Sequence, residues 1–409
     1  MSNDTQPEIR FPGFTEAWEQ RKLSDVASIV GGGTPSTSNP EYWDGDIDWY
    51  APAEIGDQIY VNKSLKTITE LGQQKSSAKI LPIGTVLFTS RAGIGNTAIL
   101  AKEGTTNQGF QSIVPHENKL DSYFIFSRTH ELKRYGEVTG AGSTFAEVSG
   151  KQMAKMPILI PYIDEQRKIG AFFGQIDEAI ALHQRKLDLL KETKKGFLQK
   201  MFPKNGAKVP EIRFPGFTED WEQRKLGEVS PLRGGFAFKS NKFVKEGIPI
   251  VRISNILSNG SVGGEFVYYT AQEKDENYLL PDKSALLAMS GATTGKVSIL
   301  NNPNNNKVYQ NQRVGYFTKT KNVDYSFIST LVRSKIFLDQ LNSVLVAGAQ
   351  PNISSKDINV FELTIPKNIE EQKKIGNFFK QLDDTIALHQ RKLDLLKETK
   401  KGFLQKMFV

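Results

Sequence analysis

The sequence predicts an α+β protein in which two mixed α/β domains are separated by two long antiparallel coiled-coil helices with pseudo-two-fold symmetry. Two internal repeats lead to this prediction. The stretch 181–202 recurs without change at 387–408. The stretch 7–23 recurs at 210–226 with one substitution. Because the long segments between the repeats differ from each other, the chain consists of two units that share a frame around unlike middles.

The spacing of the repeats predicts where each part begins and ends. Pro7 and Pro210 are 203 positions apart, whereas Ala181 and Ala387 are 206 apart, so the second middle segment is three residues longer. We call 7–23 and 210–226 the lead segments. The expected parts are a first globular domain with its lead segment at 1–162, a first long helix at 163–202, a second globular domain with linker and lead segment at 203–368, and a second long helix at 369–409.

The long helices are expected around the second repeat. Acidic residues at 164–165 and 370–371 suit a helix N-terminus, where the backbone dipole is positive. Apolar residues then follow a 4-3-4-3 spacing, which is a heptad seam. Each helix would run roughly 35 to 40 residues, or about 50 to 60 Å. The seam residues predicted to pair the helices or dock a partner are Ile169, Phe173, Ile176, Ile180, Leu187, Leu190, Ile375, Phe379, Leu382, Ile386, Leu393 and Leu396.

One amphipathic helix of this kind is not stable alone, and the other copy is the obvious antiparallel partner. The alternative is that each helix packs only on its own domain. His183 and His389 also fall on the seam. A metal site is one interpretation, but because no further ligand is near in sequence, a polar residue that sets the helix register is favoured.

The two middles are expected to share a fold with different surfaces. Short apolar runs at 85–89 and 285–289 are bounded by Gly, Pro and Asn, as is typical of strands. Weak sequence similarity relates 81–100 to 280–300, and 140–161 to 347–366. The Asn-Gln pair at 107 also recurs at 311.

No catalytic motif is found along the chain. The stretch 290–298 (SGATTGKVS) lacks the first glycine and the final Ser or Thr that a phosphate-binding loop needs. Asp44, Asp46 and Asp48 have the spacing for a divalent ion, but a polar strand edge is the favoured interpretation. The absence of cysteine excludes Cys-based zinc sites and nucleophiles, and with four histidines we expect no metal site.

The composition favours some classes of partner over others. The formal charge is +8 and the isoelectric point is near 9.2, which favours polyanions. There is no apolar run long enough to span a membrane, and the polar start MSNDTQPEIR is not a signal peptide. We therefore expect a cytoplasmic protein with no membrane partner.

The repeated frame resembles the specificity subunit of type I restriction–modification systems. The resemblance is carried by the lead sequence RFPGFTEAWEQRKL, by the helix sequence LHQRKLDLLKETKKGFLQKMF, and by their alternation with unlike middles over essentially the whole chain. It implies two target-recognition domains, each reading one half of an asymmetric bipartite DNA site in the major groove. It further implies that the helices set the unread spacer and that the chain itself is not an enzyme.

The resemblance also implies partners. Beside double-stranded DNA, two modification subunits with adenine methyltransferase activity would dock on the frame, and restriction subunits with translocase and nuclease activity would join them. S-adenosylmethionine, ATP and Mg would then belong to those subunits, and no cofactor is expected in this chain. The rival hypothesis is a non-catalytic protein-binding scaffold that never touches DNA.

The middles contain polar loop residues that can distinguish bases, since Arg suits guanine, and Asn and Gln suit adenine. The candidate DNA-binding residues are Thr34, Ser36, Ser38, Arg91, Asn96, Asn107, Gln108, Gln111, Lys239, Ser240, Arg252, Asn255, Thr293, Thr294, Lys296, Asn311, Gln312, Arg313, Gln350 and Asn352. Two loop families recur and are favoured: 90–96 with 290–296, and 107–111 with 311–313. Trp43, Trp49 and Tyr50 are expected in the core rather than stacked on a ligand.

The basic half of the first long helix, 184–204, is suited to phosphate or to a partner protein. Its identical repetition favours the partner, because both copies would present one surface to two copies of the same subunit. The lead-segment aromatics, such as Phe14 and Trp18, are expected to pack on the helix ends. Since the first helix runs into the second lead segment, we also expect the two chain termini to lie close together.

Overall fold

The computed structural model describes residues 6–91, 93–140, 146–204, 206–347 and 352–408. The chain divides into two compact units. The first unit comprises Met1–Gln184 and Arg391–Val409, and the second comprises Arg185–Gln390. Both divisions fall inside a long helix, so each unit contains one segment of each.

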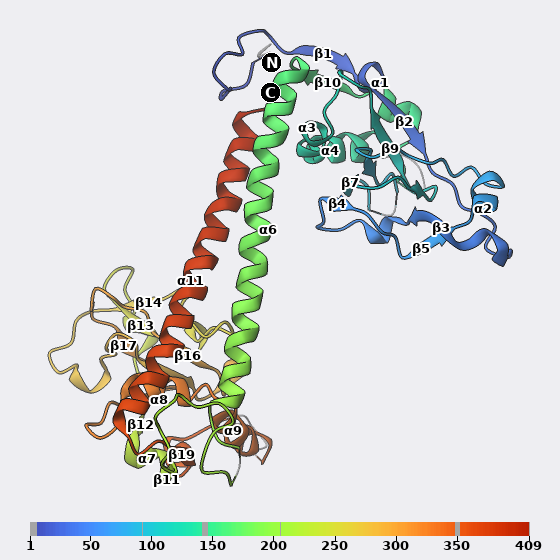
Figure 1. The fold of residues 1–409 in the computed structure, drawn as a ribbon. Helices are drawn as coiled ribbons and strands as arrows, with labels where there is room; N and C mark the ends of the chain where they lie inside the picture. Colours follow the sequence, from blue (N-terminus) through green and yellow to red (C-terminus); the bar gives the residue numbers. More distant parts are fainter. Residues whose placement is uncertain (1–5, 92, 141–145, 205, 348–351, 409) are drawn as a thin grey trace. The chain divides into compact units, whose positions relative to one another are not determined.

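The first unit contains mixed sheets and short helices (Figure 1). One sheet has the strand order β2-β9-β6-β7-β4, formed by Ala27–Gly31, Gln111–Pro115, Val86–Phe88, Thr97–Leu100 and Tyr60–Val61. Another has the order β5-β3-β8, formed by Lys66–Ile68, Trp43–Tyr50 and Thr105–Thr106. β1 (Glu19–Lys22) pairs antiparallel with β10 (Pro157–Ile160). The helices are α1 Leu23–Val26, α2 Glu70–Gln74, α3 Ser122–Ser127, α4 Thr129–Gly140, α5 Gly150–Ala154 and the first part of α6 Ile163–Lys200, with 3-10 turns η1 Pro40–Tyr42 and η2 Pro52–Glu54.

The second unit repeats this arrangement. One sheet has the order β12-β18-β15-β16, formed by Leu232–Arg233, Val314–Phe317, Ala285–Ala288 and Val297–Ile299. Another has the order β14-β13-β17, formed by Val267–Tyr269, Ile248–Val251 and Tyr309–Gln310. β11 (Glu222–Lys225) pairs antiparallel with β19 (Glu362–Ile365). The helices are α7 Leu226–Val229, α8 Tyr325–Leu331, α9 Lys335–Ala347, α10 Ser355–Asn359 and the first part of α11 Ile369–Lys406, with 3-10 turns η3 Ser240–Lys242, η4 Ile253–Asn255, η5 Glu276–Tyr278 and η6 Gly291–Thr293.

The two units share a topology, which confirms the predicted α+β class with two mixed domains. β2-β9-β6-β7 matches β12-β18-β15-β16, and the parallel pair β3–β8 matches β13–β17. Among the described residues, the first unit carries β4 and α2 in addition. The match holds although the middle sequences differ, because the apolar strand positions that fill the core are retained.

Each core is completed by the end of the long helix that comes from the other half of the sequence. In the first unit, Phe408 of the chain end packs with Phe173, with ring centroids 5.8 Å apart, and with Trp18 at 6.2 Å. In the second, Phe202 packs with Phe379 and Trp221, both at 6.3 Å. Burying such a ring contributes about 1.5–3 kcal/mol. The repeated Met-Phe pair at 201–202 and 407–408 is therefore a core element of both units.

Within each unit the two helix segments run antiparallel. In the first unit Phe172 packs edge-to-face on Phe403, and Asp177 pairs with Lys400 at 2.7 Å. Residue numbers rise along one segment as they fall along the other. The second unit repeats this with Phe378 on Phe197 and with Asp383 beside Lys194. Helix packing inside each unit thus agrees with the predicted antiparallel direction.

The lead segments join each unit to a helix end. The backbone N–H of Ile9 donates to the carbonyl of Lys406 at 2.9 Å, and that of Ile212 donates to Lys200 at 3.0 Å. The described start of the chain therefore lies beside the end of α11 (Figure 1), as predicted from the repeat.

Within the described residues, no helix combines the length and apolar character that a membrane span requires. No cluster of three or more His, Asp or Glu side chains in the same residues is arranged to hold a metal ion.

Candidate nucleic-acid interface

In the first unit, the loops that carry most of the predicted residues meet beyond the ends of β2, β8 and β9. Gly33 N–H donates to the carbonyl of Thr106 at 2.8 Å. The neighbouring Gly32 has no room for a side chain, because a Cβ would lie 2.0 Å from the Asn107 carbonyl oxygen. The glycine run is thus a place of close backbone approach that holds the 31–38 loop against the 107–110 loop.

Thr34, Asn107 and Gln108 are brought together here. The hydroxyl of Thr34 donates to the Gln108 side-chain oxygen. Asn107 N–H donates to the Tyr50 carbonyl at 3.0 Å, and its side-chain oxygen accepts from Gly109 N–H at 2.7 Å. Asn107 therefore has half of its carboxamide engaged in shaping the loop, while Gln108 is exposed.

Arg91 approaches the same place from the β6–β7 loop. Its Nε lies 3.6 Å from the point where a Cβ on Gly109 would sit. Asn96, at the other end of that loop, is exposed, and its amide donates to the Ile55 carbonyl at 3.3 Å. Gln111 pairs with Gly31 at the start of β9, beneath the 31–38 loop.

Ser36 and Ser38 are exposed and lie farther along the 31–38 loop, with their hydroxyls 2.8 Å apart. Two indoles hold this loop from below: Trp43 donates to the Ser36 carbonyl at 3.1 Å, and Trp49 to the Gly33 carbonyl at 2.8 Å. Trp49 is buried, as predicted, and so is Tyr50. These aromatics support the candidate surface from the core side.

The aspartates of β3 lie on the central strand of the β5-β3-β8 sheet, so the expected strand edge is not found. Asp48 is buried and accepts hydrogen bonds from Ser64 and from Lys102, whose Nζ lies 2.8 Å away. Burial alone would raise the pKa of Asp48, but the bonds from Lys102 and Ser64 lower it. The alternative interpretation as a divalent-ion site gains no support from this arrangement.

The second unit builds the same loop junction. Phe236 N–H donates to the Gln310 carbonyl at 2.9 Å, and a Cβ on Gly235 would lie 2.2 Å from that oxygen. Asn311 N–H donates to the Val251 carbonyl at 3.1 Å, and its side-chain oxygen accepts from Arg313 N–H at 3.4 Å. Gln312 and Arg313 are exposed.

The β15–β16 loop joins this surface. Thr293 donates to the Ile253 carbonyl at 2.9 Å, which fixes η6 on η4, and Lys296 donates to the Ser258 hydroxyl at 2.8 Å. Thr294 between them is half-buried. The exposed Asn352 precedes Ile353, whose N–H donates to the Met289 carbonyl at 2.9 Å.

Lys239 and Ser240 are exposed at the start of η3, on the loop that follows Phe236. Gln350 lies outside the described residues. Arg252 is half-buried, and its Nε is buried without a hydrogen-bond partner in the described structure.

The prediction for Asn255 is wrong in this structure. Its side chain is only 1% exposed, and its amide donates to the carbonyls of Gly263 and Glu265 while its oxygen accepts from Arg252 N–H. A carboxamide with these bonds would have to leave a buried network to touch a base. It stabilises the loop after η4 instead.

The predicted alignment of one loop family is also wrong by a residue. Thr89 N–H donates to the backbone carbonyl of Asn96, and Ala288 N–H donates to the backbone carbonyl of Lys296. Asn96 and Lys296 are therefore equivalent. At the other end, Ser90 is equivalent to Met289 rather than to Ser290. The second loop is therefore one residue longer between the same anchors.

The predicted seam residues are all buried or half-buried. Ile169, Phe173, Leu187, Ile375, Phe379 and Leu393 are buried, and Ile176, Ile180, Leu190, Leu382, Ile386 and Leu396 are half-buried. By contrast, Leu182 and Leu189 of α6 are 59% and 61% exposed, and their repeats Leu388 and Leu395 in α11 are also exposed. Residues seven apart share a helix face, so each long helix carries exposed leucines off its seam.

The frame contains a buried ion pair that sequence reasoning missed. Arg213 of the lead segment binds Glu371 in α11 through two hydrogen bonds of 2.7 and 2.8 Å, and Arg10 binds Glu165 in the same way. The bond to Glu371 raises the pKa of Arg213. Both pairs recur with the repeat although the helix sequences around them differ, which is the signal that could have revealed them.

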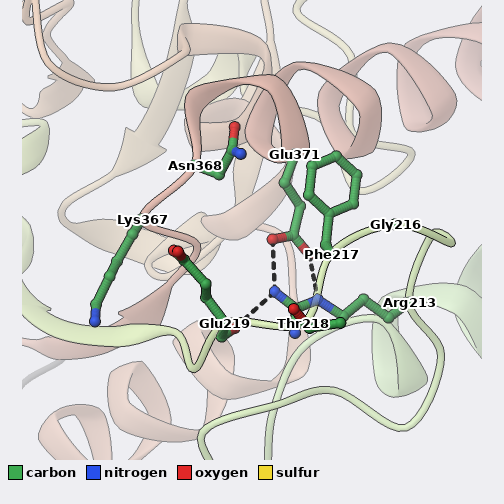
Figure 2. Close-up of a pocket in the computed structure, with 8 residues that line it drawn as sticks. All are labelled: Arg213, Gly216, Phe217, Thr218, Glu219, Lys367, Asn368 and Glu371. Carbon is green, nitrogen blue, oxygen red and sulfur yellow. Dashed lines mark hydrogen bonds and ion pairs between the residues drawn. The ribbon is translucent and has the colours of Figure 1, made fainter.

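Figure 2 shows a hollow in the second unit that is lined by Arg213 and Glu371. Phe217 and Glu219 of the lead segment and Asn368 before α11 complete its wall. Lys374 lies over the Phe217 ring at 4.9 Å, as Lys168 lies over Phe14 at 5.2 Å in the first unit. The lead-segment aromatics thus pack on the helix starts.

Known proteins show the same organisation. Residues 15–192 and 218–398 match the family described as the type I restriction modification DNA specificity domain. The chain is 26% identical over 411 residues to the type I restriction enzyme MjaIX specificity subunit of Methanocaldococcus jannaschii, covering 95% of this chain and 92% of that protein. It is 30% identical over 167 residues to the EcoR124I/EcoR124II specificity subunit of Escherichia coli, covering 39% of this chain and 41% of that protein.

Solved structures share the fold. The type I restriction–modification S subunit from M. genitalium matches with a TM-score of 0.69 at 14% identity, over 99% of both chains. A structure described by complex assembly and conformational transition of the type I R-M system matches with a TM-score of 0.50 at 19% identity, over 98% of this chain and 99% of that one. Since two copies of the family domain account for most of the sequence, the chain belongs to the family of type I restriction–modification specificity subunits, which recognise DNA sequence.

Proposed function

We propose that each globular domain reads one half of an asymmetric bipartite DNA site, and that the chain directs partner enzymes without catalysing a reaction itself. The observation that carries this proposal is that the frame is nearly identical in the two units whereas the loop side chains differ. The same loop junction is built twice, at Gly32 and at Gly235, but the side chains presented there differ. Two different sets of side chains on one scaffold suit two different half-sites.

The chemistry of the loops supports major-groove reading. Exposed amides such as Gln108 and Gln312 match the donor and acceptor edge of adenine, and the arginines match guanine. The excess positive charge of +8 favours the phosphate backbone. Phosphate contacts would position each domain, and the loop side chains would then specify the sequence.

The long helices are proposed to set the unread spacer. α6 and α11 each contain 38 residues, which corresponds to about 57 Å at 1.5 Å per residue. One turn of duplex DNA is roughly 34–36 Å long. A helix of this length is therefore sufficient to hold two reading domains about one turn or more apart.

Two modification subunits are proposed to dock on the repeated frame, with restriction subunits joining the assembly. The exposed leucines of each long helix and the ion pair between lead segment and helix recur in both repeats. A surface present twice suits two copies of one partner. S-adenosylmethionine, ATP and Mg would be bound by those partner subunits.

The test is to express this chain with its modification subunit in a host without other methyltransferases and to sequence the methylome. The expected result is methylated adenine within a two-part motif with a fixed spacer. A protein-binding scaffold would instead leave the methylome unchanged, and the purified assembly would show no sequence preference in salt-dependent DNA binding.

A further inference from the structure

The two loop junctions each contain one arginine, but at different positions of the junction. The first unit has arginine at 91, on the β6–β7 loop, and glycine at 109. The second unit has serine at 290, on the matching loop, and arginine at 313. The backbone hydrogen bonds show that these positions correspond.

Gly109 and Arg313 occupy equivalent places. Each donates its N–H to the side-chain oxygen of the asparagine two residues earlier, Asn107 or Asn311. The carbonyl of each also accepts a hydrogen bond from the loop that follows β6 or β15, at 2.8 Å from Ser90 N–H and 3.0 Å from Met289 N–H. Arg91 directly follows the first of these donors, and Ser290 directly follows the second.

The first unit brings an arginine to this place by another route. A Cβ on Gly109 would lie 2.7 Å from Pro52 Cγ, so a side chain cannot start there. The Arg91 Nε lies 3.6 Å from the same point. The guanidinium group from the neighbouring loop therefore reaches the place from which the Arg313 side chain begins in the second unit.

Among the described residues, no carboxylate holds either arginine. Most arginines of the frame are paired, as Arg10 is with Glu165 and Arg213 with Glu371. Within the described part of the chain, Arg91 and Arg313 form no ion pair. Arg313 is exposed and Arg91 is half-exposed, so both keep donors for an external acceptor.

We propose that Arg91 and Arg313 are equivalent reading residues and that each recognises a guanine at the corresponding position of its own half-site. The inference rests on the proposed function, since it assumes that the loop junctions face DNA bases. The planar guanidinium can donate two parallel hydrogen bonds to guanine O6 and N7, which is a pattern that no other base pair presents. Retention of the group by two routes is expected if each half-site requires that contact.

The experiment uses the full chain assembled with its modification subunit, and compares methylomes of wild type, Arg91→Ala and Arg313→Ala. We expect Arg91→Ala to relax one G·C position in the first half-site only, and Arg313→Ala to relax one position in the second only. A lost bidentate contact should reduce discrimination at that position roughly 5- to 150-fold. The untouched half-site serves as the internal control for folding and assembly.

Conservative variants separate base reading from phosphate binding. Arg91→Lys and Arg313→Lys keep the charge but lose the planar fork, so discrimination should still fall. If these arginines contacted phosphate instead, the Lys variants would bind like wild type, and the Ala variants would bind every sequence more weakly with a smaller salt dependence. That result would overturn the inference. Arg134→Ala removes an exposed arginine on α4, outside the loops, and should leave the motif unchanged.

A transfer variant tests the equivalence directly. In the second unit, Arg313→Gly should relax one position, and the double variant Ser290→Arg with Arg313→Gly should restore it by reproducing the arrangement of the first unit. Failure of the double variant, with the first half-site intact, would refute the equivalence. If the wild-type assembly shows no motif at all, the proposed function fails instead.

Discussion

At the scale of single residues, the candidate surface depends on side chains that are absent as much as on those present. Gly32 and Gly235 allow two loops to touch through their backbones, with no space for even a Cβ. Asn107 and Asn311 then shape the turn that follows. The side chains left to face a ligand are fewer than the loop sequences suggest, because each loop uses some of its own amides.

The glycine positions give a matched prediction. Gly32→Ala places a methyl group 2.0 Å from a carbonyl oxygen, so the loops must separate. We expect a loss of at least about 2 kcal/mol in the unfolding free energy. Gly196→Ala, in α6 with no atom within 4 Å of the new methyl group, should instead stabilise by about 0.5–1 kcal/mol. Urea unfolding of the two variants measures both, and equal effects would contradict the close approach.

The residue scale also shows where sequence reasoning fails. Asn255 and Gln108 are both loop amides, but one is buried in a backbone network and the other is exposed. Amino-acid type indicates which side chains are able to read a base. It does not indicate which of them the fold has already engaged, since that depends on carbonyls distant in the sequence.

At the scale of elements, the heptad seam predicted the long helices and their buried face. Each unit pairs helix segments through phenylalanines and one charged pair, Asp177–Lys400 or Asp383–Lys194. The two lysines have identical sequence surroundings but different neighbours. Asp383 also binds Arg333, at 2.7 Å, whereas Asp177 has the hydroxyl of Tyr123 at 2.9 Å.

This difference predicts unequal effects from equivalent substitutions. Burial lowers the pKa of Lys194, which means that its charged form is destabilised in the folded protein. If Lys194 is replaced, Arg333 still pairs with Asp383. Lys194→Met should therefore change the unfolding free energy by less than about 1 kcal/mol. Lys400→Met leaves the buried Asp177 without a cation and should cost about 3 kcal/mol. Urea titrations of both variants measure the two unfolding free energies. Equal losses would show that the different neighbours, Arg333 and Tyr123, have no effect.

The Asp383 pair also predicts a pH dependence. Burial alone would raise the pKa of Asp383, but Arg333 and Lys194 lower it. A carboxylate with a folded pKa below its unfolded value of about 3.9 stabilises above that value, and this contribution is lost as the pH falls through the folded pKa. Between pH 6 and 3, the thermal midpoint of wild type should fall more than that of Asp383→Asn. Parallel curves would contradict this assignment.

At the scale of the whole molecule, each unit carries its own loop junction and core. The division of the chain places residues 24–162 within the first unit. Replacing 24–162 by the corresponding segment of another specificity subunit should change one half of the methylated motif and leave the other half unchanged. Methylome sequencing checks this, and a change in both halves would argue against independent reading.

The proposed spacer role gives a second prediction at this scale. Inserting seven residues after Gln184 in α6 and after Gln390 in α11 keeps the heptad seam and adds about 10 Å to each helix. The unread spacer should then lengthen by roughly three base pairs, at 3.4 Å per base pair, while both half-sites keep their sequence. Altered half-sites with an unchanged spacer would refute the role of the helices in spacing.

The sequence by itself determined the two-unit organisation, the long helices, the shared fold and the family, because repeats and heptads are local patterns that are visible without coordinates. Only the tertiary structure decided that Phe408 and Phe202 complete cores far away in the sequence, and that Arg91 stands beside Gly109. It also decided that the equivalent loops differ by one residue in length. These are relations between segments distant along the chain, and they depend on backbone hydrogen bonds and packing that no single segment encodes.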